Sequence, residues 1–251
     1  MGVTFLTGAS SGIGRSLAKR IAGQGEAVAA VARRKPLLDT LVEEIERGKG
    51  QAIALACDVT DRAQVYAAVQ ETMASLGPVD RLIACAGGGE PTFVDTFAAA
   101  QISRVFTLNV GGTANCIEAL LPDMVQRGAG HLVAVSSLAA YRGLPGAAAY
   151  SAAKAALSNL IESLRIDLKP RGVDVTLLCP GFVRPRPSTK KRWKPFQLEV
   201  EEATRLLCRA IMARKRYYAF PAPLVFAAAL GRLLPASLYD RLLAGQGPRS
   251  R

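Results

Sequence analysis

The chain has 251 residues, of which 50% are hydrophobic and 21% are charged. This length suits one complete α/β domain, and so large an apolar fraction excludes disorder over most of the chain. The formal net charge is +12, and nearly all of it comes from the last quarter of the chain. Residues 1–183 carry 17 Lys and Arg against 16 Asp and Glu, whereas residues 184–251 carry 15 against 4. Such a basic block is typical of a solvated face or of a surface with an anionic partner.

The cysteines, the histidine and the N-terminus exclude several further classes. The five cysteines show no CxxC spacing, and His131 is the only histidine, so the spacing offers no His/Cys zinc cluster. We therefore expect reduced thiols, no disulfide bond and no metal. The chain opens directly with an apolar segment at Val3 rather than with a signal peptide, which favours a cytoplasmic location.

Apolar segments of strand length alternate with segments of helical periodicity. In chain order, we expect strands at 3–7, 27–32, 52–56, 79–84, 131–136 and 173–179, and helices at 13–24, 37–47, 63–76, 102–126 and 147–168. The strands are apolar at nearly every position, which is typical of parallel strands covered on both faces. The alternation predicts an α/β fold with one doubly wound Rossmann-type domain, a parallel sheet with helices on both faces.

The C-terminal quarter breaks this alternation. Residues 184–195 hold three prolines and clustered cations, which predicts a loop. A helix at 199–213, a short strand at 217–220 and an apolar helical tail at 223–243 are expected to follow. The apolar runs of the tail are too short to span a bilayer. We find no internal repeat and no interdomain linker, so we expect a single domain over residues 1–251.

The turn after the first strand has the pattern of a nucleotide site. The sequence Thr7-Gly8-Ala9-Ser10-Ser11-Gly12-Ile13-Gly14 joins the first strand to the first helix. Glycines let the backbone turn tightly and approach a pyrophosphate, and the helix N-terminus offers it free N–H groups. A merely flexible turn would share the glycines, but the position at a strand-to-helix junction favours phosphate binding.

The end of the second strand favours NADP(H) over NAD(H). An NAD site usually carries an acidic residue there for the ribose 2′-hydroxyl, whereas this chain reads Arg33-Arg34-Lys35. Cations at this place can pair with a 2′-phosphate. Arg33, nearest the strand end, is the first choice as the phosphate ligand, and Arg34 is the second. The alternative is that all three are solvated loop charges.

Tyr150 and Lys154 are the candidate catalytic pair. Their spacing of four places the phenol and the ammonium on one helix face. A tyrosine with its ordinary pKa of about 10 exchanges protons poorly at neutral pH, so we expect Lys154 to lower the pKa of Tyr150. Taken alone, the pair could equally be a surface coincidence.

Three further motifs support the catalytic reading. Ser136-Ser137 ends the fifth expected strand, Pro180-Gly181 ends the sixth, and Asn109-Val-Gly111 lies in the helix between them and the glycine turn. Strand ends of a doubly wound sheet are where ligands bind. Together with the glycine turn and the Tyr/Lys pair, these motifs resemble the short-chain dehydrogenase/reductase family over Val3 to about Val183.

The resemblance implies a role for each matching residue. Asn109 would hold a water for a proton relay, Ser137 would hydrogen-bond the substrate oxygen with Ser136 as the less favoured neighbour, and Tyr150 and Lys154 would be the catalytic pair. Asp58 would contact the adenine amino group. The implied cofactor-binding positions are Gly8, Ser10, Gly12, Ile13, Gly14, Asp58, Val59, Tyr150, Lys154, Pro180, Gly181 and Val183.

The implied activity is that of an NADPH-dependent oxidoreductase, which moves hydride between the nicotinamide and a carbonyl or alcohol. In two places the chain departs from the family pattern. Cys85 replaces an asparagine, so a tie between neighbouring strands is expected to be missing, and Arg184 replaces a threonine that tethers the substrate loop. His131, which starts a strand away from the reacting edge, is expected to be structural.

Residues 184–216 correspond to the family's substrate loop or lid, and 217–251 to a C-terminal extension. The cations of 184–194 suit an anionic or lipid-like substrate, or docking of an acidic carrier protein, and Trp193 either lines the pocket or packs over it. The apolar tail with Tyr217, Tyr218 and Phe220 either touches a membrane surface peripherally or packs on the sheet or on a sister subunit.

Three alternatives bear on partners and activity. A homodimer or homotetramer is a family expectation. A catalytically silent protein that senses or binds NADP(H) is the alternative to an enzyme. A nucleic-acid partner is not expected, because the basic tail lacks a recognised binding motif and shows little aromatic interleaving.

Overall fold

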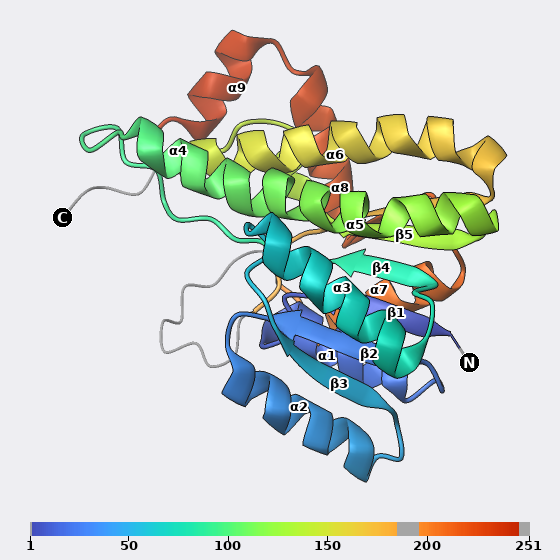
Figure 1. Ribbon diagram of the computed structural model, residues 1–251. Helices are drawn as coiled ribbons and strands as arrows, with labels where there is room; N and C mark the ends of the chain where they lie inside the picture. Colours follow the sequence, from blue (N-terminus) through green and yellow to red (C-terminus); the bar gives the residue numbers. More distant parts are fainter. Residues whose placement is uncertain (1, 185–195, 246–251) are drawn as a thin grey trace.

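The structure, a computed structural model, describes residues 2–184 and 196–245. Its centre is a parallel seven-stranded sheet of order β3-β2-β1-β4-β5-β6-β7 (Figure 1). The elements of the first half are β1 (Val3–Thr7), α1 (Gly12–Ala22), β2 (Ala27–Ala32), α2 (Lys35–Arg47), β3 (Ala52–Ala56), α3 (Arg62–Leu76) and β4 (Arg81–Ala84).

The second half continues the sheet and adds the helices of the C-terminal region. Its elements are α4 (Ala99–Phe106), the π-helical turn η1 (Thr107–Gly111), α5 (Gly112–Arg127), β5 (Gly130–Val135), the 3₁₀ turn η2 (Leu138–Ala140), α6 (Ala148–Leu168), the 3₁₀ turn η3 (Lys169–Arg171), β6 (Val173–Pro180), α7 (Val200–Met212), β7 (Tyr217–Phe220), α8 (Ala222–Leu233) and α9 (Ala236–Leu243).

Helices cover both faces of the sheet, as the sequence predicts. One apolar core lies between the sheet and α3, α5 and α6, and a second lies between the sheet and α1, α2 and α7 (Figure 1). Every residue of β1 and of β2 is buried. The strand order reverses between β1 and β4, which places a crevice at the carboxyl ends of these strands. The doubly wound α/β prediction is therefore confirmed.

Two expected helices are interrupted. The helix expected over 102–126 begins at Ala99 and contains the π-helical turn η1. Within it, Asn109 Nδ2 donates to the Val105 carbonyl at 2.8 Å and Thr113 Oγ1 donates to the Asn109 carbonyl at 3.0 Å. Such side-chain bonds compete with the regular backbone ladder. The tail expected over 223–243 divides at Pro235, which has no N–H to continue a helix.

His131 belongs to a buried polar network, which confirms its structural role. Arg81 Nε donates to His131 Nδ1 at 3.1 Å, and His131 Nε2 is 2.8 Å from Thr176 Oγ1. Arg81 also forms an ion pair with Glu26 at 2.5 Å. Burial and the neighbouring Arg81 lower the pKa of His131 to about 3, so its ring is neutral at physiological pH.

Two observations on the described ranges, 2–184 and 196–245, concern a membrane and a metal ion as partners. No helix in them is both long and apolar enough to traverse a bilayer. They also contain no group of three or more His, Cys, Asp or Glu side chains arranged to hold a metal ion.

Candidate active site

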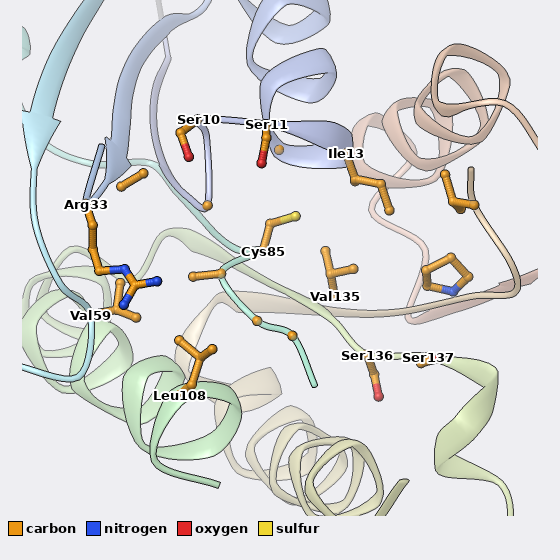
Figure 2. Close-up of a pocket in the computed structure, with 18 of the residues that line it drawn as sticks. Ser10, Ser11, Ile13, Arg33, Val59, Cys85, Leu108, Val135, Ser136 and Ser137 are labelled. Carbon is orange, nitrogen blue, oxygen red and sulfur yellow. The ribbon is translucent and has the colours of Figure 1, made fainter. Parts of the chain in front are cut away.

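A cavity of about 670 Å³ opens along the carboxyl edge of the sheet, where residues that follow β1 to β6 meet (Figure 2). Its volume is within the range of roughly 300–1,000 Å³ that is usual for ligand sites. The predicted site residues that line it are Gly8, Ser10, Ile13, Gly14, Arg33, Arg34, Asp58, Val59, Ser137, Tyr150, Lys154, Pro180, Gly181 and Val183. Gly12 and Asn109 lie outside this lining.

The glycine turn is shaped for close approach by a ligand. Gly8 and Gly12 have φ angles of +72° and +55°, which side chains rarely allow. A side chain on Gly8 would also meet the Ala86 nitrogen at 2.9 Å, and one on Gly14 would collide with the Gly8 carbonyl. The Ser11 side chain makes no capping hydrogen bond to α1. The first N–H groups of α1 are thus not capped by that side chain, and the turn fits a pyrophosphate.

Two arginines lie at the same end of the cavity. Arg34 Nη2 donates to Ser10 Oγ at 2.8 Å and to Ser11 Oγ at 3.0 Å. Arg33 projects into the cavity in Figure 2, and its Nη1 is 3.8 Å from Asp58 Oδ2 with 72% of its side chain exposed. Among the described lining residues, Asp58 is the only carboxylate. The arrangement therefore offers two cations to an anionic group at this end.

Ser137, Tyr150 and Lys154 meet at the other end of the cavity. Ser137 hydrogen-bonds to Tyr150, and its Oγ also accepts a bond from the Ala139 N–H at 3.1 Å. Lys154 is buried, 5.7 Å from the centre of the Tyr150 ring, and donates to the Val135 carbonyl at 2.9 Å. Ser136 Oγ instead donates to the Lys154 carbonyl at 3.0 Å, which ties β5 to α6. This contact favours Ser137 over Ser136 as the substrate-facing serine.

The expectation that Lys154 lowers the pKa of Tyr150 is wrong for this structure. Burial raises the pKa of Tyr150, and the hydrogen bond from Ser137 opposes that shift only in part. Burial also lowers the pKa of Lys154, to about 8. The Lys154 ammonium donates to the Val135 carbonyl and is not among the groups that shift the pKa of Tyr150. Tyr150 is thus a protonated phenol at neutral pH.

The match to a known family identifies the chain. A family model for short chain dehydrogenases matches residues 2–195. The chain belongs to the short-chain dehydrogenase family. Its relatives include an uncharacterized oxidoreductase of Myxococcus xanthus, 38% identical over 237 residues that cover 94% of each chain.

Two solved structures are similar over most of the chain. A short-chain dehydrogenase from Streptomyces avermitilis has a TM-score of 0.82 and 28% identity, covering 96% of this chain and 95% of that one. A 3-ketoacyl-ACP reductase from Sinorhizobium meliloti has a TM-score of 0.76 and 28% identity, covering 86% of this chain and 97% of that one. This short-chain dehydrogenase is therefore an oxidoreductase of a family that uses nicotinamide cofactors and small-molecule substrates.

Asn109 holds the backbone of Gly88, in the segment that follows β4, through hydrogen bonds. The side chain is fully buried, and Nδ2 donates to the Gly88 carbonyl at 2.7 Å as well as to Val105. Its Oδ1 accepts from the Gly88 N–H at 3.3 Å. Both side-chain N–H groups are thus engaged, so a relay water would have to use an oxygen of Asn109. That water remains a prediction.

Glycines that follow β4 pack directly on the side chains of Asn109, Lys154 and Tyr150. A side chain on Gly87 would meet Asn109 Oδ1 at 2.7 Å and Lys154 Nζ at 3.1 Å, and one on Gly89 would meet the Tyr150 ring at 2.7 Å. The sequence shows three successive glycines after a strand but does not say what they are for. In the structure, glycine at positions 87 and 89 leaves room for the Lys154 ammonium and the Tyr150 ring.

Backbone N–H groups tie the segment that contains Cys85 to β1. Thr7 Oγ1 at the end of β1 accepts from the Cys85 N–H at 3.1 Å and from the Ala86 N–H at 3.0 Å. These bonds from backbone N–H groups join β1 to the segment after β4 without any contribution from the Cys85 side chain, so the loss of a side-chain tie at this position stays a prediction. Cys85 lines the cavity, and burial raises its pKa to about 11, which keeps the thiol neutral.

Further lining residues escaped the sequence prediction. Most of them directly follow a strand, as Cys57 and Ala86 do, and strand ends were the signal that could have found them. Leu108 was not predictable in this way, because the π-helical turn places it.

At the substrate loop, the described residues pair across its base. Val183 forms a bridge with Leu198, and the Arg184 N–H donates to the Leu198 carbonyl at 2.9 Å. The Arg184 guanidinium lies 3.1 Å from Glu199. Residues 185–195, which include Trp193 and most of the expected loop cations, lie outside the described residues.

Proposed function

We propose that this short-chain dehydrogenase is an NADPH-dependent oxidoreductase that reduces a carbonyl to an alcohol, or runs the reverse reaction. One observation carries the proposal. A single cavity joins a glycine turn flanked by Arg33 and Arg34 to the hydroxyl groups of Ser137 and Tyr150. A dinucleotide needs the first end, and a reacting carbonyl oxygen needs the second.

The chemistry divides between the cofactor and the side chains. When bound, the nicotinamide supplies or accepts the hydride. Ser137 Oγ accepts the Ala139 N–H, and its hydroxyl proton, which is directed at Tyr150 in this structure, turns to the carbonyl oxygen when substrate is bound. Tyr150 gives its proton to that oxygen while the hydride adds to the carbon, which yields the alcohol. Hydroxyl groups fixed at the developing oxyanion stabilise it without reorganisation.

The protonated state of Tyr150 favours reduction as the chemical direction. Burial raises the pKa of Tyr150, and a phenol that retains its proton is the acid form that carbonyl reduction needs. Lys154, buried beside it with a pKa of about 8, is charged below that pH. We assign to Lys154 the return of a proton to Tyr150 through water held at Asn109.

The preference for NADPH rests on charge at the end of β2. Arg33 and Arg34 line the cavity there, and the chain has no carboxylate at the position that NAD sites use for the ribose hydroxyl. A 2′-phosphate between the two guanidinium groups would gain charge-assisted hydrogen bonds. Asp58, held by Thr60 at 2.8 Å, is assigned to the adenine.

Substrate, assembly and location form part of the same proposal. We assign a small carbonyl or alcohol substrate, anionic or lipid-like in view of the basic residues 184–194. The ketoacyl reductase among the similar structures is consistent with carbonyl reduction. A homodimer or homotetramer is assigned from the family. Five free thiols support a cytoplasmic location.

The test is NADPH consumption by the purified protein over a panel of ketones and aldehydes, followed at the nicotinamide absorbance. We expect turnover, and we expect Tyr150→Phe to lower kcat by roughly 10²–10⁴ with NADPH affinity retained. Tyr66→Phe is the matched control, because this hydroxyl lies on α3 and contacts Arg62. A Tyr150→Phe protein as fast as wild type would refute the proton transfer. NADPH binding with no turnover over the panel would favour the silent binding protein.

A further inference from the structure

The outer face of α8 is apolar and is not covered by the fold. Phe226, Leu230 and Leu233 follow one another at i, i+4 and i+7, which puts them on one face of the helix, and they are 72%, 49% and 82% exposed. The opposite face, with Leu224, is half-buried against the body. A helix with apolar side chains all round needs an apolar environment at its outer face as well as at its inner face.

Helix α9 is also little buried. Leu238 is 44% exposed, and no residue of α8 or α9 is buried. Figure 1 shows α9 as the outermost element, beyond α6 and α4. We call α8 and α9 together the C-terminal hairpin, residues 222–243. It covers little of the apolar core, so packing on the core does not account for its composition.

Polar contacts hold the hairpin in a fixed orientation. Arg142 Nη1 donates to the carbonyls of Gly231 at 2.5 Å and Leu234 at 2.8 Å, and its guanidinium lies 3.9 Å from the centre of the Tyr239 ring. Tyr239 donates its hydroxyl proton to the Gly143 carbonyl at 2.7 Å. Arg142 and Gly143 lie in the loop that joins Ser137 to Tyr150. The exposed face of the hairpin therefore has a set direction relative to the active site.

The hairpin also packs against a residue that lines the cavity. A side chain on Gly181, which lines the cavity, would meet Leu224 Cδ1 at 3.1 Å. Two further apolar side chains are strongly exposed in the segment before α4, Val94 at 86% and Phe97 at 62%.

Charge and length indicate what covers this face. The hairpin carries two cations, Arg232 and Arg241, against one anion, Asp240, and the chain as a whole carries a net charge of +12. A twofold dimer through the hairpin would bring two positively charged copies together, which like-charge repulsion opposes. An anionic lipid surface attracts the same charges. Helices of 12 and 8 residues are about 18 and 12 Å long, which suits lying on a bilayer of roughly 30 Å apolar thickness.

We propose that the C-terminal hairpin docks the protein on an anionic phospholipid surface through Phe226, Leu230 and Leu233. The apolar side chains enter the boundary between headgroups and acyl chains, and Arg232 and Arg241 contact the lipid phosphates. The Arg142 contacts keep the loop between Ser137 and Tyr150 on the membrane side. This proposal does not depend on the reaction catalysed.

The test is co-sedimentation of the full chain with phosphatidylcholine vesicles, with and without phosphatidylglycerol. We expect binding to the anionic vesicles, weaker binding in high salt, and little binding to phosphatidylcholine alone. The double variant Phe226→Asp/Leu233→Asp should lower the partition coefficient at least about tenfold, because burying one apolar side chain is worth that much. The milder Phe226→Ala/Leu233→Ala should show the same direction if the aspartates disturb folding.

Ile166→Asp is the matched control, because Ile166 on α6 is as exposed as Phe226, at 72%, but lies outside the hairpin. It should bind vesicles like wild type. Absence of binding to anionic vesicles would overturn the proposal, and so would equal loss in Ile166→Asp. A change of oligomeric size in light scattering, specific to the hairpin variants, would show instead that a second copy covers this face.

Discussion

Removal of the two arginines at the end of β2 tests the cofactor assignment most directly. Arg33→Ala and Arg34→Ala should each lower kcat/KM for NADPH and leave kcat/KM for NADH nearly unchanged. A hydrogen bond to a charged group contributes about 1.5–3 kcal/mol, and about 1.4 kcal/mol corresponds to a factor of ten. The expected losses therefore range from about tenfold to about a hundredfold.

The structure orders the two effects within this range. Arg33 is 72% exposed and its ion pair with Asp58 is long, at 3.8 Å, so screening places it at the lower limit, about tenfold. The hydroxyl groups of Ser10 and Ser11 already fix the Arg34 guanidinium, at 2.8 and 3.0 Å. Less side-chain entropy is then lost on binding, so Arg34→Ala should show the larger loss. This order reverses the one that the sequence favours.

The assay is the ratio of kcat/KM for NADPH to that for NADH, measured at low salt and again at about 1 M salt, where the screening length is about 3 Å. The ratio should fall in both variants, and less so in high salt. Lys35→Ala is the control, because Lys35 pairs with Asp39 at 2.6 Å and does not line the cavity. A ratio unchanged in both arginine variants, or an equal fall in Lys35→Ala, would refute a 2′-phosphate site here.

Three further predictions concern pH and the C-terminal hairpin. Because the pKa of Lys154 is lowered to about 8, the rate of carbonyl reduction should fall as the pH rises through 8, and Lys154→Arg should move that fall to higher pH in a pH–rate profile. His131, with its pKa lowered to about 3, takes up its proton first in the unfolded state. Stability should therefore decrease as the pH falls below 6.5, by about 3 kcal/mol at pH 4.5, and this decrease should be absent from urea unfolding of His131→Asn. Arg142→Ala removes two hydrogen bonds and the contact with the Tyr239 ring, so limited chymotrypsin digestion should cut the hairpin faster than in wild type.

Each of these has an outcome that contradicts it. A flat rate across pH 8 in wild type would show that Lys154 is not the titrating group. An acid-induced loss of stability of equal size in His131→Asn would assign it to other groups. For the hairpin, Tyr239→Phe should give an intermediate digestion rate, because it keeps the ring that Arg142 contacts and loses only the hydroxyl bond to Gly143. Digestion of Arg142→Ala at the wild-type rate would mean that other contacts hold the hairpin.

The sequence by itself determined the sheet and the list of candidate residues. Strand and helix periodicities are local properties, and a strand buried on both faces is apolar at nearly every position, as β1 and β2 are. The glycine turn could be predicted for a similar reason, since positive φ angles at Gly8 and Gly12 restrict those positions to glycine. Helix boundaries agree within two residues except in two places: the helix expected over 102–126 begins at Ala99 and contains the π-helical turn at Asn109, and the tail divides at Pro235.

Only the tertiary structure decided the state of the catalytic groups. A spacing of four in the sequence places Tyr150 and Lys154 on one helix face, but it does not reveal the Val135 carbonyl that takes the ammonium. Burial, which depends on every element packed around the site, raises the pKa of Tyr150 instead. The bonds that the Cys85 and Ala86 N–H groups donate to Thr7 Oγ1 likewise join residues nearly eighty positions apart. Contacts between distant segments arise only when the sheet assembles, and they set the charges and the orientation on which the chemistry depends.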